Sequence, residues 1–346
     1  MSEASFDYWD FFIGEARRAG APLYEGLARG VAQDDEIKAL AQAVRPGQPA
    51  ANVLFAAVHL QLLRGADHPL RAYYPNLNGG KAATDLSNAY FAFRDFVAGH
   101  RAQLSPLIET RSTNTNEIGR SAMLHGGFRA VAAEAGEPLH LVEIGPSAGL
   151  NLVWDRYGIR YRLPDRVVDS GAHDARLVVE TALRGCHLPP IGDNPRVASR
   201  VGLERSPVDL SDIDERDWLR ALVWPDHVER FARLEAAIAL VAGETLPIRC
   251  GDALSLLPEA LAEVPADAPV CVYHTFVTYQ FSDAARNALD DLLVAVGLRR
   301  PVWRLSWEGS LSGDAPLLLH TYRGGATHTR TLAVGHPHGA WLEWRA

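Results

Sequence analysis

The chain has 346 residues, of which 47% are hydrophobic and 22% are charged, as in a globular protein rather than a disordered one. Its formal net charge of −8 argues against non-specific binding to nucleic acid or to anionic membranes, because both need a basic surface. No stretch approaches the roughly 18 uninterrupted apolar residues of a membrane-spanning helix, and residues 1–12 lack the pattern of a secretory signal. We therefore expect a cytoplasmic protein, and its length predicts two domains.

A helical pattern covers residues 6–133. Within it, residues 50–64 are apolar on most faces, which predicts a buried helix. The loop at 68–80 is rich in Pro, Asn, Gly and Tyr, and it either connects helices or lines a pocket. We assign residues 1–110 to an N-terminal helical region and residues 111–346 to a second domain.

A dense polar cluster at residues 111–120 comes just before a helix predicted from about 117 to 135. Thr115 fits the start of that helix, where a hydroxyl can cap the free backbone N–H groups. Asn116 and Arg120 either support the helix in the same way or clamp a carboxylate of a ligand. The sequence leaves both roles open for these two residues.

The most informative stretch is residues 139–152, LHLVEIGPSAGLNL. A short apolar run ends near Glu143, a turn of small residues follows, and an apolar segment then starts a predicted helix. Gly145 and Gly149 permit positive φ angles or a close approach of the backbone to a ligand. N–H groups at the start of a helix favour carboxylate or phosphate. The stretch therefore predicts the ligand loop of a doubly wound α/β domain, with Glu143 at the carboxyl end of its first strand.

Strand and helix patterns alternate through the rest of the chain, which predicts a mostly parallel sheet with right-handed crossovers. Two short alternating runs within residues 158–185, at 159–163 and 176–179, predict an inserted hairpin. A terminal antiparallel hairpin and a last strand close the sheet. The further predicted strands cover residues 196–206, 246–254, 269–279, 302–307, 317–322, 327–334 and 341–344.

Three acidic residues follow successive predicted strands: Glu143, Glu204 and Asp252. In an open α/β sheet the carboxyl ends of the strands form the ligand crevice. A carboxylate after the second strand can accept hydrogen bonds from ribose hydroxyls, and one after the third can accept from the amino group of adenine.

This constellation resembles the class I S-adenosylmethionine-dependent methyltransferases, whose first motif is an acid followed by Gly-x-Gly-x-Gly. Glu143, Gly145, Ser147 and Gly149 match that motif, with a serine at its middle glycine. The resemblance implies a Rossmann-like sheet that binds S-adenosylmethionine and transfers its methyl group to an acceptor, which we expect to be a small molecule.

By the same resemblance, Glu204 would bind the ribose, and Asp252 with Ala253 would bind the adenine. Further residues that we expect to contact the cofactor are Asn116, Arg120, Pro146 and Asn151.

A larger part of the chain, from about Leu54 to the end, resembles the bacterial DUF2332 family, a domain of unknown function. That resemblance implies the methyltransferase-like fold but no substrate. It rests on Thr115-Asn116-Glu117-x-x-Arg120, on residues 143–152 and 154–157, and on Val223-Trp224-Pro225, Gly251-Asp252-Ala253 and His338-Gly339-x-Trp341.

A serine hydrolase is the rival interpretation, because Ser147 lies in a Gly-x-Ser-x-Gly pattern and residues 125–128 imitate an oxyanion motif. Asp252 and then His274 or His320 follow in the required order. The spacing argues against this, since an oxyanion loop belongs to an earlier strand and only one helix and one strand fit here. A third interpretation is a non-catalytic protein that binds a nucleoside-like ligand.

Methyl transfer needs the acceptor to be aligned and, where it carries a proton, deprotonated. His274, near the end of the fourth predicted strand, is the candidate base, with Tyr279 and Asp155 favoured as structural residues. His336 and His338 flank a proline, which favours a turn over a metal site, so no metal is predicted.

Overall fold

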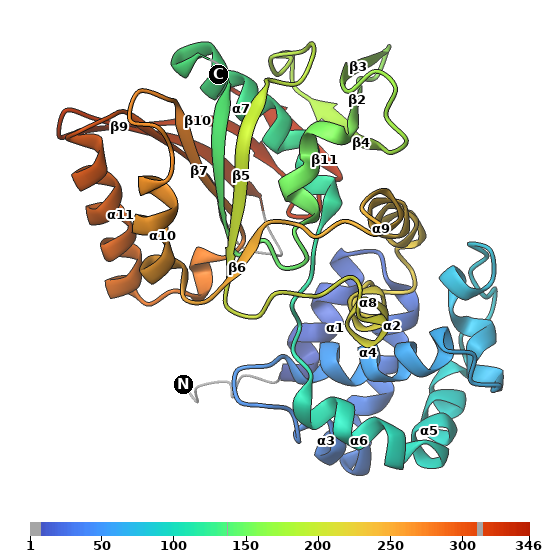
Figure 1. Cartoon of the computed structure of the whole chain (residues 1–346). Coiled ribbons are helices and arrows are strands. Elements are labelled where there is room, and N and C mark those ends of the chain that lie inside the picture. Colours follow the sequence, from blue (N-terminus) through green and yellow to red (C-terminus); the bar gives the residue numbers. More distant parts are fainter. Residues whose placement is uncertain (1–7, 137, 310–313) are drawn as a thin grey trace, which may run out of the picture. The chain divides into compact units, whose positions relative to one another are not determined.

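The computed structural model describes residues 8–136, 138–309 and 314–346, and they divide into two units (Figure 1). One unit comprises the chain up to Thr115 together with Asp209–Glu235. The other comprises Asn116–Val208 and Ala236–Ala346. The predicted boundary at residue 110 assigns residues 209–235 to the second domain. In the structure this segment belongs to the first unit. Phe6, the predicted start of the helical region, lies outside the described residues.

The first unit is built from helices around α4 (Ala50–Leu63), whose side chains are buried on nearly all faces. Trp218 of α8 (Ile213–Ala221) belongs to the same apolar core. Asp34 and Asp212 cap α3 and α8 by accepting hydrogen bonds from backbone N–H groups of the first turn. The other helices are α1 (Tyr8–Arg18), α2 (Pro22–Ala32), α3 (Asp35–Ala41), η1 (Pro69–Tyr73), η2 (Pro75–Leu77), α5 (Ala89–Gly99), α6 (Arg101–Thr110), α8 (Ile213–Ala221) and the start of α9 (Val228–Leu240).

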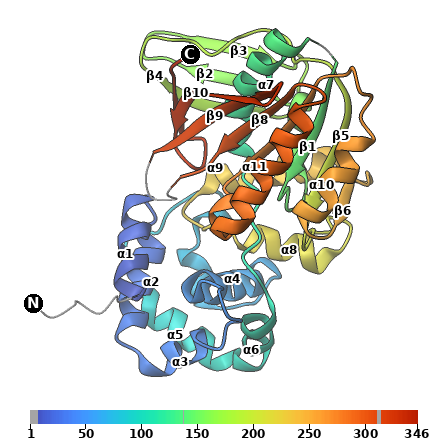
Figure 2. The same ribbon diagram turned by 90° about the vertical axis from the view of Figure 1, so that its left-hand side faces the viewer.

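The second unit is α/β, as predicted, with a mixed, mostly parallel sheet of the order β3-β2-β4-β11-β10-β9-β8-β7-β1-β5-β6 (Figure 2). Its parallel core is β6-β5-β1-β7-β8, and β9 then runs antiparallel beside β8. The strands are β1 (Leu139–Ile144), β2 (Gly158–Arg162), β3 (Val167–Gly171), β4 (Val178–Arg184), β5 (Val197–Glu204), β6 (Ile248–Cys250), β7 (Val270–Thr275), β8 (Val302–Trp307), β9 (Ala315–Arg323), β10 (Ala326–Gly335) and β11 (Trp341–Trp344).

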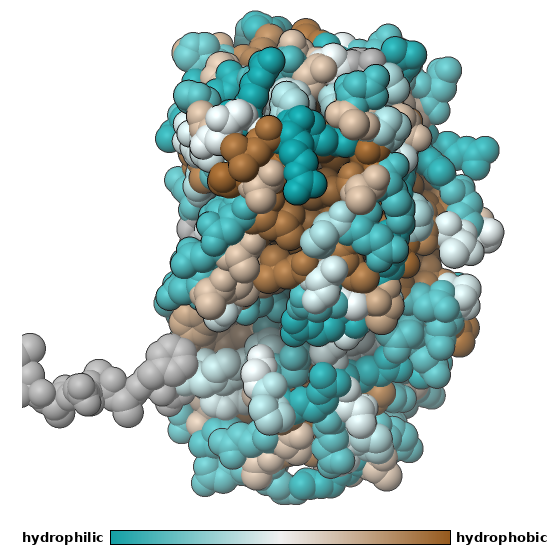
Figure 3. All heavy atoms as spheres, turned by 60° about the vertical axis from the view of Figure 1, so that its left-hand side comes forward, coloured by the Kyte–Doolittle hydropathy of each residue, from teal (hydrophilic) through white to brown (hydrophobic). Residues whose placement is uncertain are grey.

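Helices cover both faces of this sheet. On one face lie α10 (Ala253–Ala262) and α11 (Asp283–Gly297), and on the other lies α7 (Ser121–Ala135) (Figure 1). Val142, Val270 and Val272 face α10 and α11 in one apolar cluster. Half-buried apolar residues add to this layer, and Figure 3 shows apolar atoms gathered among polar ones on one face of the molecule. Within the described residues, no helix is long and apolar enough to cross a membrane.

The insertion between β1 and β5 differs from the predicted hairpin. The strand that pairs antiparallel with β2 is β3, whereas β4 runs parallel to β2 and also pairs with β11. The sequence did not predict β3, because β3 is an edge strand whose first three residues are exposed or half-buried. Such a strand lacks the alternation of apolar and polar residues that a covered strand shows.

The helix predicted after the glycine turn is a 3-10 helix, η4 (Leu150–Arg156), which ends where β2 begins. The cap predicted at Thr115 is also displaced. Glu117 accepts the hydrogen bond from the Gly119 N–H (3.0 Å) at the start of η3 (Ile118–Arg120), and α7 follows directly. Both differences shorten the regular helices around the turn.

Candidate functional site

The carboxyl ends of β1 and β7 lie side by side, and the chain order reverses between them. From β1 the next core strands, β5 and β6, lie on one side, and β7 and β8 lie on the other. When the core strands are numbered by their order in the chain, their order across the sheet is 3-2-1-4-5. This is the arrangement in which open α/β sheets bind ligands at the switch point. The turn at residues 145–149 starts at this point.

The turn has an unusual backbone. Gly145, Ser147 and Gly149 have φ angles of 69°, 58° and 80°. Among the described residues the non-glycine residues with positive φ are Ser147 and Phe276, which follow the adjacent strands β1 and β7. A left-handed conformation costs a non-glycine residue roughly 1–2 kcal/mol, and such strain concentrates at functional sites.

Two close approaches hold the turn in place. A Cβ atom on Gly145 would lie 2.5 Å from a methyl carbon of Val277, and one on Gly202 of β5 would lie 2.6 Å from Pro146 Cγ. The glycines thus allow Val277 and Pro146 to pack against the backbone. Pro146 is buried and packs on β5, and its contact with a cofactor stays a prediction.

Glu204 lies at the end of β5, and its side chain bonds to the turn. Its Oε2 accepts from the Ser147 N–H at 2.9 Å, and its Oε1 accepts from the Ser206 N–H at 3.1 Å. A carboxylate accepts about four hydrogen bonds, so half-buried Glu204 retains acceptor capacity.

Asn116 and Arg120, from the chain segment before α7, and Asn151, from η4, support this region. Asn116 Oδ1 accepts from the Leu150 N–H (2.9 Å), and the Ser121 hydroxyl donates to Asn151 Oδ1 (2.9 Å). The Arg120 guanidinium donates to the Thr275 carbonyl at 3.0 Å. All three make bonds within the protein that position the turn and the start of α7. Their contact with a cofactor stays a prediction.

The Glu143 carboxyl group is buried, with 2% of its residue surface exposed. It accepts a hydrogen bond from the Tyr273 hydroxyl at 3.0 Å. Burial, opposed by this bond and reinforced by the negative charge of Glu204, raises the pKa of Glu143 to about 8. Glu143 is therefore mostly protonated at neutral pH, which allows two acidic side chains to lie near each other.

Asp252 lies beyond the next strand, β6, and caps α10. Its Oδ1 accepts from the Ser255 N–H at 3.1 Å, and its Oδ2 accepts from Arg205 at 3.0 Å. Burial opposes ionisation, but the Arg205 and Ser255 bonds outweigh it and lower the pKa of Asp252. Ala253 opens α10 and packs, half-buried, against the apolar cluster.

His274 lies on β7, but its side chain leaves the sheet on the other face from Glu143. Glu143 is in register with Tyr273, and successive side chains of a strand alternate between faces. His274 Nδ1 bonds to Glu308 Oε1 at 2.7 Å, whereas its buried Nε2 has no hydrogen-bond partner among the described residues. The structure thus brings Glu143 and Glu204 together and leaves His274 outside that pair.

Sequence reasoning missed the partners of these residues. Tyr273 lies within a strand predicted from its apolar pattern, and Glu308 directly follows the fifth predicted strand. The sequence analysis predicted no functional role for either residue. Glu308 also accepts from the N–H groups of Val277 (3.0 Å) and Thr278 (3.2 Å). A carboxylate directly after a strand, comparable to Glu143 near the end of β1, was the signal that could have identified Glu308.

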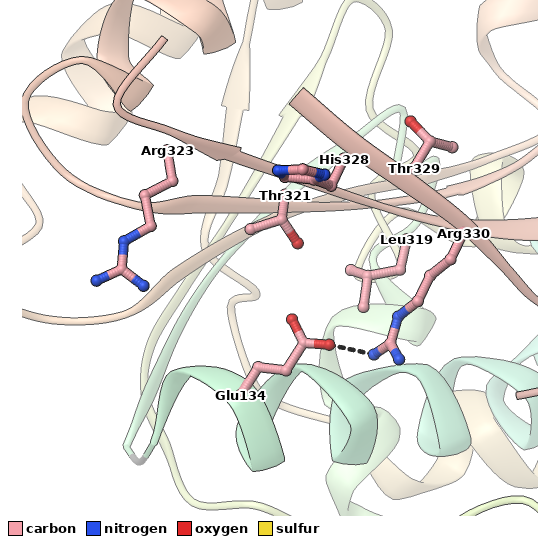
Figure 4. A pocket seen from close by; sticks show the side chains of 7 residues that line it. All are labelled: Glu134, Leu319, Thr321, Arg323, His328, Thr329 and Arg330. Atoms are coloured by element: carbon pink, nitrogen blue, oxygen red, sulfur yellow. Dashed lines mark hydrogen bonds and ion pairs between the residues drawn. The ribbon is translucent and has the colours of Figure 1, made fainter. Parts of the chain in front are cut away.

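A surface hollow of about 490 Å³ lies elsewhere on the same unit (Figure 4). Its lining includes Glu134 of α7 and Thr321 of β9, which pairs with β8 near the amino end of the parallel strands. The hollow therefore lies toward the amino ends of the parallel strands, whereas the glycine turn lies at their carboxyl ends. The complete lining is Glu134, Leu319, Thr321, Arg323, His328, Thr329 and Arg330.

Residues 11–344 match the model of a bacterial protein family described as "Uncharacterized protein conserved in bacteria (DUF2332)". The chain belongs to this family, as its motifs predicted. No curated protein matches the sequence significantly.

Proposed function

We propose that this family member is an S-adenosylmethionine-dependent methyltransferase that acts on a small molecule. One observation carries the proposal. A sheet of the order 3-2-1-4-5 carries carboxylates at or just after the ends of its first three strands, at Glu143, Glu204 and Asp252. The antiparallel β9 beside the fifth strand also agrees with the fold that the sequence resemblance implies.

The hydrogen bonds of the turn favour this cofactor over a dinucleotide. A pyrophosphate needs free backbone N–H groups at the turn. Here the Ser147 N–H donates to Glu204, the Gly149 N–H to the Pro146 carbonyl and the Leu150 N–H to Asn116. The edge of the sheet instead presents acceptors, which suit ribose hydroxyls and the amino and sulfonium groups of a cationic nucleoside.

Glu204 would hold the ribose with its remaining lone pairs, and Asp252 would accept from the adenine amino group. Glu143, protonated at neutral pH, would stabilise the turn without placing a second negative charge beside Glu204. When bound, S-adenosylmethionine supplies a methyl group on a sulfonium that is ready for in-line displacement.

His274 is our candidate for the base. Because Glu308 is a carboxylate and can only accept, it selects the tautomer with a proton on Nδ1. That tautomer leaves the Nε2 lone pair available to take a proton from the acceptor hydroxyl or amine. This role requires the acceptor to approach on the α10 and α11 face of β7.

The Asp252→Ala variant is expected to bind S-adenosylmethionine at least tenfold more weakly than the wild-type protein. Its N-cap is lost as well, at a cost of about 1 kcal/mol in the free energy of unfolding. Asp212→Ala is the matched control, because Asp212 caps α8 in the helical unit by the same kind of bond. Calorimetric titration and urea unfolding of both variants measure the two effects.

We expect similar stability losses in the two variants and weaker cofactor binding only in Asp252→Ala. Equal affinities in wild type and Asp252→Ala would remove this residue from the site. Tighter binding of NAD or ATP than of S-adenosylmethionine would overturn the choice of cofactor.

A serine hydrolase is the second candidate, favoured by the φ of 58° at Ser147, because nucleophilic serines occupy strained turns after a strand. Among the residues that the structure describes, His274 Nε2 has no partner and so makes no bond to the Ser147 hydroxyl. A fluorophosphonate probe distinguishes the two functions. We expect no label on Ser147, and labelling lost in Ser147→Ala would establish the hydrolase.

A further inference from the structure

The surface hollow of the sheet unit lies between the β9–β10 hairpin and the end of α7, and the nucleoside site does not use it (Figure 4). Its volume of about 490 Å³ falls within the roughly 300–1,000 Å³ of small-molecule sites. Leu319 of β9, with 1% of its surface exposed, supplies the apolar part of the lining. The other lining residues are polar or charged, so the hollow suits a small molecule that carries a charged group.

The register of the hairpin brings Thr321, Arg323 and His328 next to one another. Thr321 and His328 are directly opposite each other in the antiparallel pair, which sets their Cβ atoms roughly 4.5–5.5 Å apart. Arg323 follows Thr321 by two residues, so its side chain leaves the same face of the strand about 7 Å further along. This face of the hairpin therefore presents a hydroxyl, a guanidinium and an imidazole within reach of one ligand group.

The carboxylate in the lining is already paired within the protein. Glu134, near the end of α7, forms an ion pair with Arg330 (Figure 4). Its other oxygen accepts from the Trp303 indole N–H at 3.1 Å. Arg330 also lies beside the carboxyl end of a helix, where the backbone dipole favours a cation. Arg330 is thus committed to Glu134 and to α7, and the two charges balance each other.

The positive charge of Arg323 is not balanced in this way. No carboxylate of a described residue forms an ion pair with Arg323. The lining contains two arginines and one histidine against one glutamate, so its net charge is positive. The chain as a whole has a formal net charge of −8. A positive hollow on an acidic protein attracts small anions to that place.

We propose that this hollow binds a small phosphate monoester, at a site that is independent of the nucleoside site. A phosphate group has three terminal oxygens that accept hydrogen bonds, which matches the three donor side chains of Arg323, Thr321 and His328. The planar guanidinium of arginine pairs well with phosphate. A carboxylate has only two oxygens and would satisfy this set less well. The organic part of the ligand would lie over Leu319.

Phosphorus NMR of the full chain tests this site with phenyl phosphate and inorganic phosphate as the probes. We expect saturable line broadening for both, and tighter binding of phenyl phosphate because its ring can contact Leu319. Acetate at equal ionic strength should displace phenyl phosphate at least tenfold less effectively than inorganic phosphate does. S-adenosylhomocysteine should displace neither probe.

Three variants with exposed positions locate the binding. Arg323→Gln removes the unbalanced charge and is expected to weaken the apparent affinity for phenyl phosphate about tenfold or more. Glu134→Gln removes the negative charge of the lining and should strengthen binding severalfold. Arg176→Gln is the matched control, because it makes the same change of charge outside the hollow, and it should leave the affinity unaltered.

An affinity of Arg323→Gln equal to that of the wild-type protein would overturn the proposal, and so would weaker binding in Glu134→Gln. An equal loss in Arg176→Gln and Arg323→Gln would show that the probe responds to the net charge of the protein and not to the hollow. Acetate that displaces phenyl phosphate as well as inorganic phosphate does would overturn the assignment to a phosphate.

Discussion

The Glu143→Gln variant is expected to gain stability over the wild-type protein as the pH rises from about 5 to about 8. In the folded wild-type protein, burial raises the pKa of Glu143 to about 8 from an ordinary value of 4.5. Between these values the folded state holds a proton that the unfolded state has released. The contribution of Glu143 to the wild-type free energy of unfolding therefore falls by about 1.4 kcal/mol for each pH unit in this window. Glutamine has no proton to lose, so the variant does not share this decline.

Urea unfolding at pH values from 4 to 9 measures the effect. Glu259→Gln makes the same chemical change at an exposed position of α10 in the same unit and should run parallel to the wild-type curve. The difference between Glu143→Gln and wild type should be flat below about pH 4.5 and again above about pH 8. Parallel curves for wild type and Glu143→Gln throughout would contradict the buried, protonated carboxyl.

The Gly339→Ala substitution is expected to destabilise the protein by roughly 3 kcal/mol. Gly339 has a φ of 71°, and a Cβ atom there would lie 2.2 Å from the Gly119 carbonyl oxygen. The left-handed backbone costs an alanine roughly 1–2 kcal/mol, and the clash with backbone atoms adds about as much again. Because the Pro337 carbonyl accepts from Arg120 at 3.0 Å, displacement of this turn also disturbs the segment that supports the glycine loop.

Gly324→Ala is the matched control in the same unit. Gly324 has a φ of 58°, but nothing lies within 4 Å of an added Cβ, so only the backbone cost of roughly 1–2 kcal/mol remains. Thermal or urea unfolding of both variants separates the clash from the strain. Equal losses in the two proteins would mean that the turn at 336–339 does not pack on Gly119 as described.

The parallel core could be predicted because its strands carry their own signal. β7 and β8 are buried in all residues. Each is a mostly apolar run that contains two polar residues, and turn residues bound it. The pairing of β4 with β11 could not be predicted, since their sequence separation is large and either strand reads equally well as an edge. The membership of residues 209–235 in the helical unit could not be predicted for the same reason. Trp218 packs in the apolar core of that unit through long-range contacts, which no local sequence pattern indicates.

The residue types of the site could be predicted, but the face of the sheet on which each side chain projects could be predicted less well. The acids at Glu143, Glu204 and Asp252 could be placed because strand ends are local features. The face on which His274 projects depends on its register against Glu143 across two strands, and a shift of one residue reverses it. The hydrogen bonds from the turn to Glu204 and Asn116 also depend on long-range contacts. The sequence therefore predicted free N–H groups at the turn, whereas in the structure the Ser147 and Leu150 N–H groups donate to these two side chains.

A crystal structure of the protein with S-adenosylhomocysteine tests the central claim most directly. The account predicts electron density for the nucleoside over the carboxyl ends of β1 and β5, with the ribose hydroxyls hydrogen-bonded to Glu204 and the adenine amino group at Asp252. Crystals that bind no nucleoside at millimolar concentration, or that bind it away from this edge of the sheet, would contradict it.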